Sequence, residues 1–138
     1  MRLLLTLFTA AALVVSIAAC SDSFSPTVEN VAGDYTLARL TTVTDTGGTV
    51  EWMPEGATFT ISLAPNGTTT GHLFIPGANA GSDFNADMAG TWALTGRVVR
   101  FTQTADSFVR DMDFIAGNKN LTGDETFTDT RVRVVLTK

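Results

Sequence analysis

The middle of the chain reads Phe84-Asn85-Ala86-Asp87-Met88-Ala89-Gly90-Thr91-Trp92-Ala93-Leu94. Successive side chains of a β-strand point to opposite faces, so every second residue shares a face. One face then carries apolar residues almost throughout, and the other carries mainly polar and small ones. A helix would scatter the apolar residues around its circumference. The pattern therefore predicts a long strand over residues 83–95 with one apolar face.

Four turns define how the other strands pair around this one. Pro65-Asn66-Gly67 is typical of a three-residue hairpin loop, and Gly96-Arg97, Gly117-Asn118 and Asp129-Thr130 are read as two-residue turns. A slip of one residue would move each side chain to the wrong face. Counting outward from the turns predicts these pairs on the inner face: Leu63–Thr69, Ile61–Gly71, Phe59–Leu73, Leu94–Val99, Trp92–Phe101, Met112–Gly123, Arg110–Glu125, Phe108–Phe127, Phe127–Val132 and Glu125–Val134.

The spacing of strands and turns predicts an all-β fold. The expected strands are 33–43, 57–64, 68–75, 83–95, 98–104, 107–116, 119–127 and 131–137, with a short addition at 49–53. Consecutive strands joined by short turns favour an eight-stranded antiparallel up-and-down barrel. A two-sheet β-sandwich is the alternative. The face of Arg39 is left open, because a bulge in the first strand would reverse it.

Composition excludes several function classes. The chain has 138 residues, with 9 Lys and Arg against 14 Asp and Glu, and a net charge of −5. No basic cluster is available to replace counterions on phosphates, so nucleic acid is not an expected partner. One Cys and one His cannot form an internal disulfide, a Cys-rich zinc site or a multi-His metal site. No nucleophile elbow, phosphate loop or metal motif occurs, so we expect no enzyme and no cofactor.

The N-terminus has the pattern of a secretory signal peptide. Arg2 supplies a positive start, residues 3–19 are mostly apolar, and small residues precede Cys20. The ending Ile17-Ala18-Ala19-Cys20 resembles the lipobox of bacterial lipoproteins. That resemblance implies cleavage before Cys20, lipidation of its sulfur and acylation (for example with palmitate) of the new amine. An ordinary signal peptide with an unmodified Cys is the alternative.

The resemblance also implies a place for the protein in the cell. The expected organisation is a cleaved signal peptide over 1–19, a lipidated Cys20 with a flexible tether over 20–30, and one domain over 31–138. The protein would be anchored in the lipid bilayer of the cell envelope and face the periplasm or the cell exterior. Ser21, rather than Asp, follows Cys20, which favours the outer over the inner membrane. The oligomeric state is left open.

The start of the domain, Asn30-Val31-Ala32-Gly33-Asp34-Tyr35, resembles the Asn-x-x-Gly-x-Trp opening of lipocalins, with Tyr in place of Trp. A similar phrase, 90–96, occurs in mid-chain. The region 30–138 looks like the short lipocalin-like domains of bacterial lipoproteins. The resemblance implies a barrel that is open at one end and holds a small apolar ligand.

Five residues are the candidate ligand contacts: Trp92, Phe101, Arg110, Met112 and Glu125. The first question is whether Trp92, Phe101 and Met112 line a pocket or fill a core. Arg110 and Glu125 are either a polar handle for a ligand or a self-satisfied cross-strand ion pair. Trp52 and Met53 are either a lid or a plug at the barrel end. A cavity of roughly 300 Å³ or more would favour ligand binding, and a filled core would favour a protein-interaction or inhibitor module.

Overall fold

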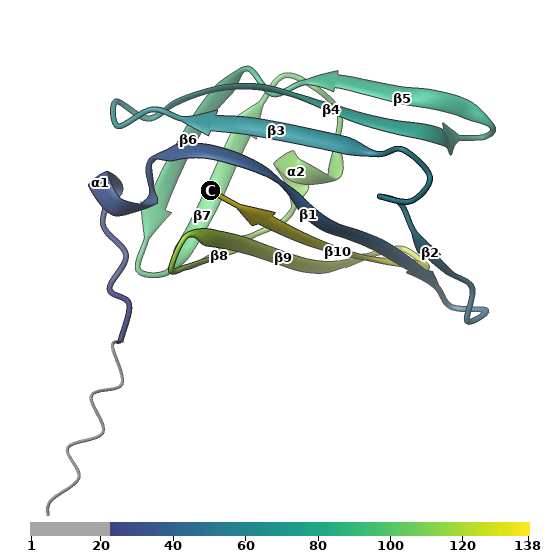
Figure 1. Cartoon of the computed structure of the whole chain (residues 1–138). Helices are drawn as coiled ribbons and strands as arrows, with labels where there is room; N and C mark the ends of the chain where they lie inside the picture. The colour runs from purple at the N-terminus through teal and green to yellow at the C-terminus, as the bar shows by residue number, and fades with distance from the viewer. Residues whose placement is uncertain (1–22) are drawn as a thin grey trace, which may run out of the picture.

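The computed structural model describes residues 23–138 and shows a closed antiparallel β-barrel (Figure 1). Each barrel strand pairs with the next one along the chain, and the last pairs with the first. This closure confirms the eight-stranded up-and-down barrel and excludes the two-sheet sandwich. The barrel strands are β1 (Gly33–Thr44), β3 (Thr58–Leu63), β4 (Thr68–Asn79), β6 (Gly90–Thr95), β7 (Val98–Gln103), β8 (Phe114–Gly117), β9 (Asn120–Phe127) and β10 (Thr130–Thr137).

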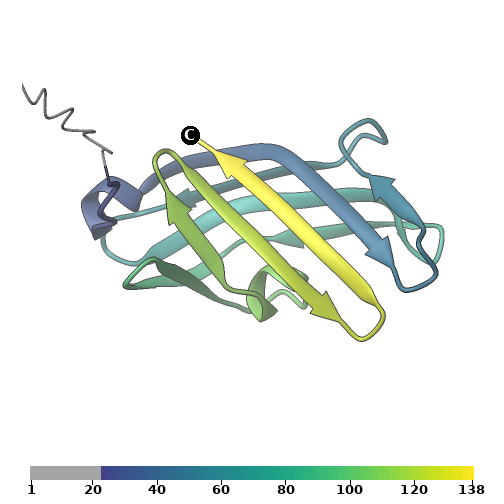
Figure 2. The same ribbon diagram turned by 90° about the horizontal axis from the view of Figure 1, so that it is seen from below.

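Two further strands and two short helices complete the described chain. β2 (Thr49–Glu51) pairs with the second half of β1, and β5 (Ser82–Asp87) pairs with the second half of β4. The helices are α1 (Val28–Val31) and α2 (Phe108–Asp111). The β1–β2 and β4–β5 hairpins project beyond the barrel at the end away from α1 (Figure 1). Seen from below, β8, β9, β10 and β1 form one continuous face (Figure 2).

The long strand expected over 83–95 is present with one interruption. β5 and β6 share a single register on β4, with Leu73 opposite Ala86 and Thr69 opposite Gly90. The break falls next to Gly71, whose carbonyl accepts a hydrogen bond from Met88 N at 3.0 Å. A Cβ at Gly71 would lie 2.1 Å from Thr60 O, and its φ is +145°. Only glycine allows the strands to approach this closely.

The first two hairpin turns follow the sequence prediction. Gly67 and Gly96 have φ of +89° and +61° respectively, which suits the turn positions assigned to them. The pairs Leu63–Thr69, Ile61–Gly71, Phe59–Leu73, Leu94–Val99 and Trp92–Phe101 are all confirmed.

The last two hairpin turns were predicted wrongly by two residues. Gly117 pairs with Asn120, and Phe127 pairs with Thr130. The loops are therefore 118–119 and 128–129, in which Lys119 and Thr128 have φ of +60° and +51°. A shift of two residues keeps every side chain on its face, so the apolar pattern cannot detect it. The predicted pairs Met112–Gly123, Phe108–Phe127, Phe127–Val132 and Glu125–Val134 are wrong for this reason.

The strand expected over 107–116 is a helix followed by a short strand. β7 pairs with β8 only through Val98–Ile115 and Val99–Phe114. The rest of β7 packs against α2 instead. A buried side chain, Val109, fixes α2 to the core. This helix therefore closes the barrel wall where β7 and β8 part.

The barrel interior is filled over most of its length. Phe101 and Phe114 pack edge to face, with ring centroids 5.3 Å apart, an arrangement that adds about 0.5–1.5 kcal/mol to the burial of the rings. The sequence left undecided which face of the strand Arg39 takes. A bulge between Leu37 and Arg39 turns its side chain outward. Most residues predicted on the inner face are buried, among them Phe59, Ile61, Leu63, Trp92, Phe101 and Val134. Leu94, Phe108 and Phe127 are half-buried, and Arg110 and Glu125 are exposed.

The described part of the expected tether lies against the barrel. Phe24 packs on the core, and Thr27 caps α1 by accepting a hydrogen bond from Asn30 N. Lys138 Nζ donates to Asn30 O at 2.6 Å and to Ala32 O at 2.7 Å, which joins the end of α1 to the last residue of the chain. From Phe24 onward the chain therefore contacts the barrel, and residues 20–22 of the expected tether lie outside the described residues.

Candidate ligand-binding site

A cavity of about 610 Å³ lies at the end of the barrel that is distant from α1. We call it the mouth cavity. It is formed where the β1–β2 and β4–β5 hairpins extend past the filled core, with the neighbouring β9–β10 hairpin and α2 completing the wall (Figure 1). Its volume lies within the range of about 300–1,000 Å³ that is usual for small-molecule sites. The barrel is therefore filled at one end and hollow at the other.

The wall of the mouth cavity is mainly apolar and rich in aromatic side chains. Its apolar members are Leu40, Val50, Trp52, Ile75, Ala78, Phe84, Phe108, Phe127 and Val132. The polar members are Thr42, Thr44, Asp106, Ser107, Asp111 and Thr130. Several of the apolar residues are only partly buried, such as Trp52, Phe84, Phe108 and Phe127. Covering them with an apolar molecule would contribute about 25 cal/mol for each Å² removed from water.

Trp52 is held in the wall by hydrogen bonds from both its backbone and its side chain. Its backbone N–H donates to Leu40 O at 2.9 Å, and its carbonyl accepts from Ala57 N at 3.0 Å. The indole Nε1 donates to Thr42 Oγ1 at 2.9 Å. The ring is half-buried and lines the cavity. The sequence left open whether Trp52 is a lid or a plug. In the structure it is neither: Trp52 is a fixed part of the wall at the barrel end, which narrows the mouth cavity without filling it.

α2 supplies the charged part of the wall. Arg110 Nη2 donates to Asp106 Oδ1 at 2.7 Å, and its Nε donates to Asp111 Oδ1 at 2.8 Å. The guanidinium holds the pKa of Asp111 below its ordinary value, mainly through this hydrogen bond. Asp106 and Asp111 both line the mouth cavity, whereas Arg110 does not. The cavity therefore has an acidic edge.

The apolar residues singled out by the sequence belong to the filled part of the barrel. Trp92, Phe101 and Met112 are at most 6% exposed, and none of them lines the mouth cavity. Trp92 Nε1 donates to Ala64 O at 2.8 Å, which satisfies its one polar atom. The sequence left open whether these residues line a pocket or fill a core. All three belong to the filled core.

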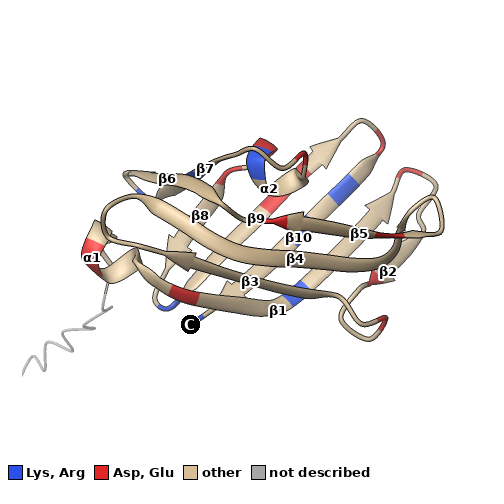
Figure 3. Ribbon diagram, turned by 90° about the horizontal axis from the view of Figure 1, so that it is seen from above, with Lys and Arg blue, Asp and Glu red and all other residues tan. Residues whose placement is uncertain are grey.

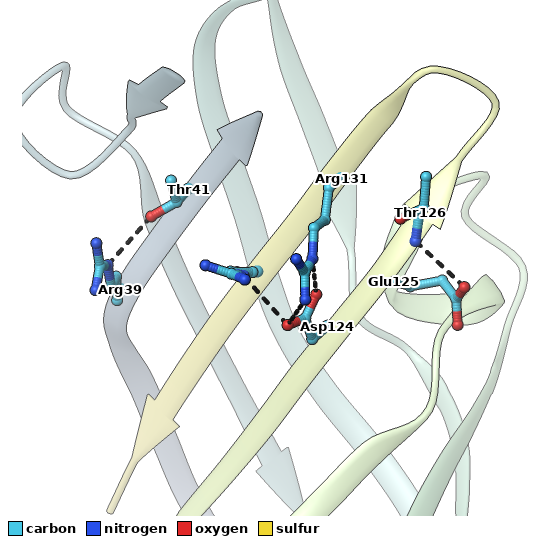
Figure 4. A network of polar contacts seen from close by, with 7 residues as sticks. Arg39, Thr41, Asp124, Glu125, Thr126 and Arg131 are labelled. Carbon is cyan, nitrogen blue, oxygen red and sulfur yellow. Dashed lines mark hydrogen bonds and ion pairs between the residues drawn. The ribbon is translucent and has the colours of Figure 1, made fainter. Parts of the chain in front are cut away.

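The predicted Arg110–Glu125 pair is wrong. Arg110 lies in α2 and is bound to Asp106 and Asp111, while Glu125 lies opposite Val132 and is exposed. Glu125 accepts a hydrogen bond only from Thr126 N, at 3.2 Å, among the described residues (Figure 4). The cause is the two-residue error at the 118–119 turn together with the unrecognised helix.

The outer face of the barrel carries cross-strand ion pairs. Asp124 of β9 accepts hydrogen bonds from Arg131 Nε at 2.6 Å and from Arg133 Nε at 3.1 Å (Figure 4). Both arginines lower the pKa of Asp124. His72 is exposed and lies beside Asp87 and Asn85, at 3.1 and 3.2 Å. These groups satisfy one another on the outer surface, and none of them lines the mouth cavity.

Within residues 23–138, no helix is long and apolar enough to cross a membrane, and no group of three or more His, Cys, Asp or Glu side chains is placed to hold a metal. Cys20 lies outside the described residues. No protein-family model, curated protein or solved structure matches the chain. The function must therefore be argued from the site.

Sequence reasoning placed Phe84, Phe108, Phe127 and Val132 on the inner face and Trp52 at the barrel end, but it did not bring them together as one site. Its lining residues come from β1, β2, β4, β5, α2, β9 and β10, so no local motif unites them. One signal was available for α2. Ser107 is a typical first residue before a helix, and it precedes Phe108-Val109-Arg110-Asp111.

Proposed function

We propose that this protein is a lipid-anchored lipoprotein of the cell envelope that binds a small apolar ligand in the mouth cavity of a lipocalin-like barrel, and that it acts by binding rather than catalysis. The observation that carries the proposal is the cavity of about 610 Å³ with its mainly apolar wall. It exceeds the volume of roughly 300 Å³ that favours a ligand site.

The construction of the barrel supports a preformed site. The closed sheet and the filled end hold the strands that form the cavity wall, and Trp52 is fixed by three hydrogen bonds. A wall that is already ordered loses little conformational entropy when a ligand enters. Most of the free energy of apolar burial in the mouth cavity therefore contributes to affinity.

The position of the chain start supports an anchor that leaves the mouth free. The described chain begins at Ser23, close to α1, and the mouth cavity lies at the opposite end (Figure 1). Cys20 precedes Ser23 by three residues, which reach at most about 10 Å. A lipidated Cys20 would attach the α1 end to the membrane, outer rather than inner, and direct the mouth away from it. Two or more acyl chains are enough for stable anchoring.

A protein-interaction module is the second candidate, and one observation favours it. Among the described residues, β5 pairs only with β4, so its outer edge offers unpaired backbone groups to an added strand. The mouth cavity favours the first candidate, because strand addition at β5 does not require a cavity.

Native mass spectrometry of the protein purified from its own host tests ligand binding. We expect a non-covalent adduct of one apolar small molecule that is lost on collisional activation. Folded protein without any adduct, accompanied by a co-purifying polypeptide, would instead support the interaction module.

The anchor is tested by labelling cells with a palmitate analogue. We expect the protein to incorporate the label and a Cys20→Ser variant to lose it and leave the membrane fraction. Equal labelling of the two proteins would exclude lipidation at Cys20.

A further inference from the structure

The charges at the mouth cavity have one sign. Among residues 23–138, Asp106 and Asp111 are the charged side chains that line it, and no Lys, Arg or His does so. Figure 3 shows acidic and basic residues together on α2. The basic one, Arg110, is bound to both carboxylates, at 2.7 and 2.8 Å. Two carboxylates against one guanidinium leave one negative charge at this edge.

Ser107 lies between these acids in the chain and also lines the cavity. It is only 6% exposed, and its Oγ has no hydrogen-bond partner among the described residues. Ser107 occupies the N-cap of α2, where its hydroxyl would ordinarily accept a backbone N–H, but it makes no such bond. A buried hydroxyl without a partner is destabilising. A polar hydrogen of a bound molecule would satisfy it once a small shift of α2 opens the hydroxyl to the cavity, because the oxygen itself has almost no accessible surface.

We infer that the ligand of the mouth cavity is a cationic amphiphile, with an apolar body against Phe84 and Phe108 and a protonated amine beside Asp106, Asp111 and Ser107. This inference rests on the proposed binding function. An ammonium group donates hydrogen bonds and accepts none, which suits two carboxylates and a hydroxyl. A carboxylate-ended amphiphile would find no cation in the described wall to pair with.

The solvent exposure of the two carboxylates limits how strongly the site can prefer a cationic ligand. The side chains of Asp106 and Asp111 are 90% and 48% exposed, so water and salt screen them. Exposed ion pairs change an equilibrium constant by about twofold to fivefold. We therefore expect the apolar body to provide most of the affinity and the amine to provide a modest selectivity that decreases with salt.

The test compares decylamine, decanol and decanoate, which share one apolar chain, by calorimetric titration of the purified protein at low ionic strength. The expected order is decylamine, then decanol, then decanoate, each step about threefold, which is the range for exposed charges. Decanoate binding as tightly as decylamine would overturn the inference and leave the proposed function intact. Absence of binding by all three would overturn the proposed function itself.

Variants assign the preference to these residues. Asp106→Asn/Asp111→Asn removes both negative charges and leaves the Arg110 guanidinium at this edge, so the ratio of decanol to decylamine dissociation constants should fall below 1. Arg110→Gln should raise the same ratio, because it removes the positive charge that offsets the acids, and a merely damaged site would not show this increase. Asp34→Asn, at the α1 end, is the matched control and should keep the wild-type ratio. A ratio unchanged in both α2 variants would also overturn the inference.

Discussion

The indole Nε1 of Trp52 donates a hydrogen bond of 2.9 Å to Thr42 Oγ1, which ties the segment after β2 to the inner face of β1. Thr42 and Trp52 both line the mouth cavity, so this bond sets the shape of the wall. The same segment is closed by a hydrogen bond from Gly56 N to Met53 O at 3.0 Å. The mouth thus has a defined edge rather than a loose loop.

Trp52→Phe should destabilise the protein by about 0.5–1.5 kcal/mol, because it removes a half-buried hydrogen bond and leaves the Thr42 hydroxyl without its donor. Urea unfolding measures the loss. A double-mutant cycle with Thr42→Val isolates the bond, and we expect a coupling free energy of similar size. Strictly additive effects would show that the bond does not form in solution.

Trp92→Ala should destabilise the protein far more than Trp52→Phe does. Trp92 is 6% exposed in the filled part of the barrel and donates to Ala64 O. Truncation of a buried Trp to Ala costs about 3–5 kcal/mol. Urea unfolding again provides the measurement, and a loss below about 1 kcal/mol would contradict the core position of this side chain and the register of β6.

The effects of Arg110→Leu and Glu125→Leu on stability should add. Arg110 contacts Asp106 and Asp111, while Glu125 lies on β9 opposite Val132. Residues without shared partners show little coupling. A double-mutant cycle by thermal unfolding checks this, and a coupling as large as that of a buried ion pair would contradict the observed register.

The two hairpins that the sequence predicted correctly differ from the other two in a physical way. Gly67 and Gly96 occupy left-handed positions that glycine marks in any sequence. Lys119 and Thr128 adopt the same conformation without being glycine, which is uncommon. The turn was therefore predicted at Gly117, the nearest glycine, although Gly117 is the last residue of β8.

The candidate site was less predictable than the fold for a related reason. Phe108, Arg110, Met112 and Phe114 alternate as in a strand, and a helix of four residues is too short to show its own period. The strand pattern fixes which face a residue takes but not how far a strand extends past the core. The mouth cavity results from that extension of β1, β4 and their partners.

Alkaline pH should lower the stability of the folded protein through the ionisation of Tyr35. Its hydroxyl donates to Val31 O at 2.6 Å, and burial raises the pKa of Tyr35 to about 12. An unfolded Tyr has a pKa near 10, so the folded state disfavours ionisation. The contribution of Tyr35 is therefore complete below about pH 10 and is lost as the pH rises toward 12.

Tyr35→Phe separates this effect from general alkaline unfolding. At pH 7 the variant should be less stable by about 1 kcal/mol, the usual value of one hydrogen bond. At pH 11 the difference should become smaller, because Phe cannot ionise. Urea titrations of both proteins at the two pH values measure it, and an equal difference at both would contradict the burial of the Tyr35 hydroxyl.

Calorimetric titration of decanol into the wild-type protein and into Ala78→Trp tests the proposed binding in the mouth cavity most directly. Nine methylenes at about 0.8 kcal/mol each provide at most about 7 kcal/mol, so the Kd should be no tighter than about 10 µM. Ala78 is exposed and lines the cavity, so a Trp there fills the site without entering the core. Ala93→Trp, on the outer face of β6, is the matched control. We predict that Ala78→Trp weakens decanol binding at least about tenfold, the effect of losing two buried methylenes, while Ala93→Trp does not change it. Decanol binding that is absent from the wild-type protein, or equally tight in Ala78→Trp, would contradict the account.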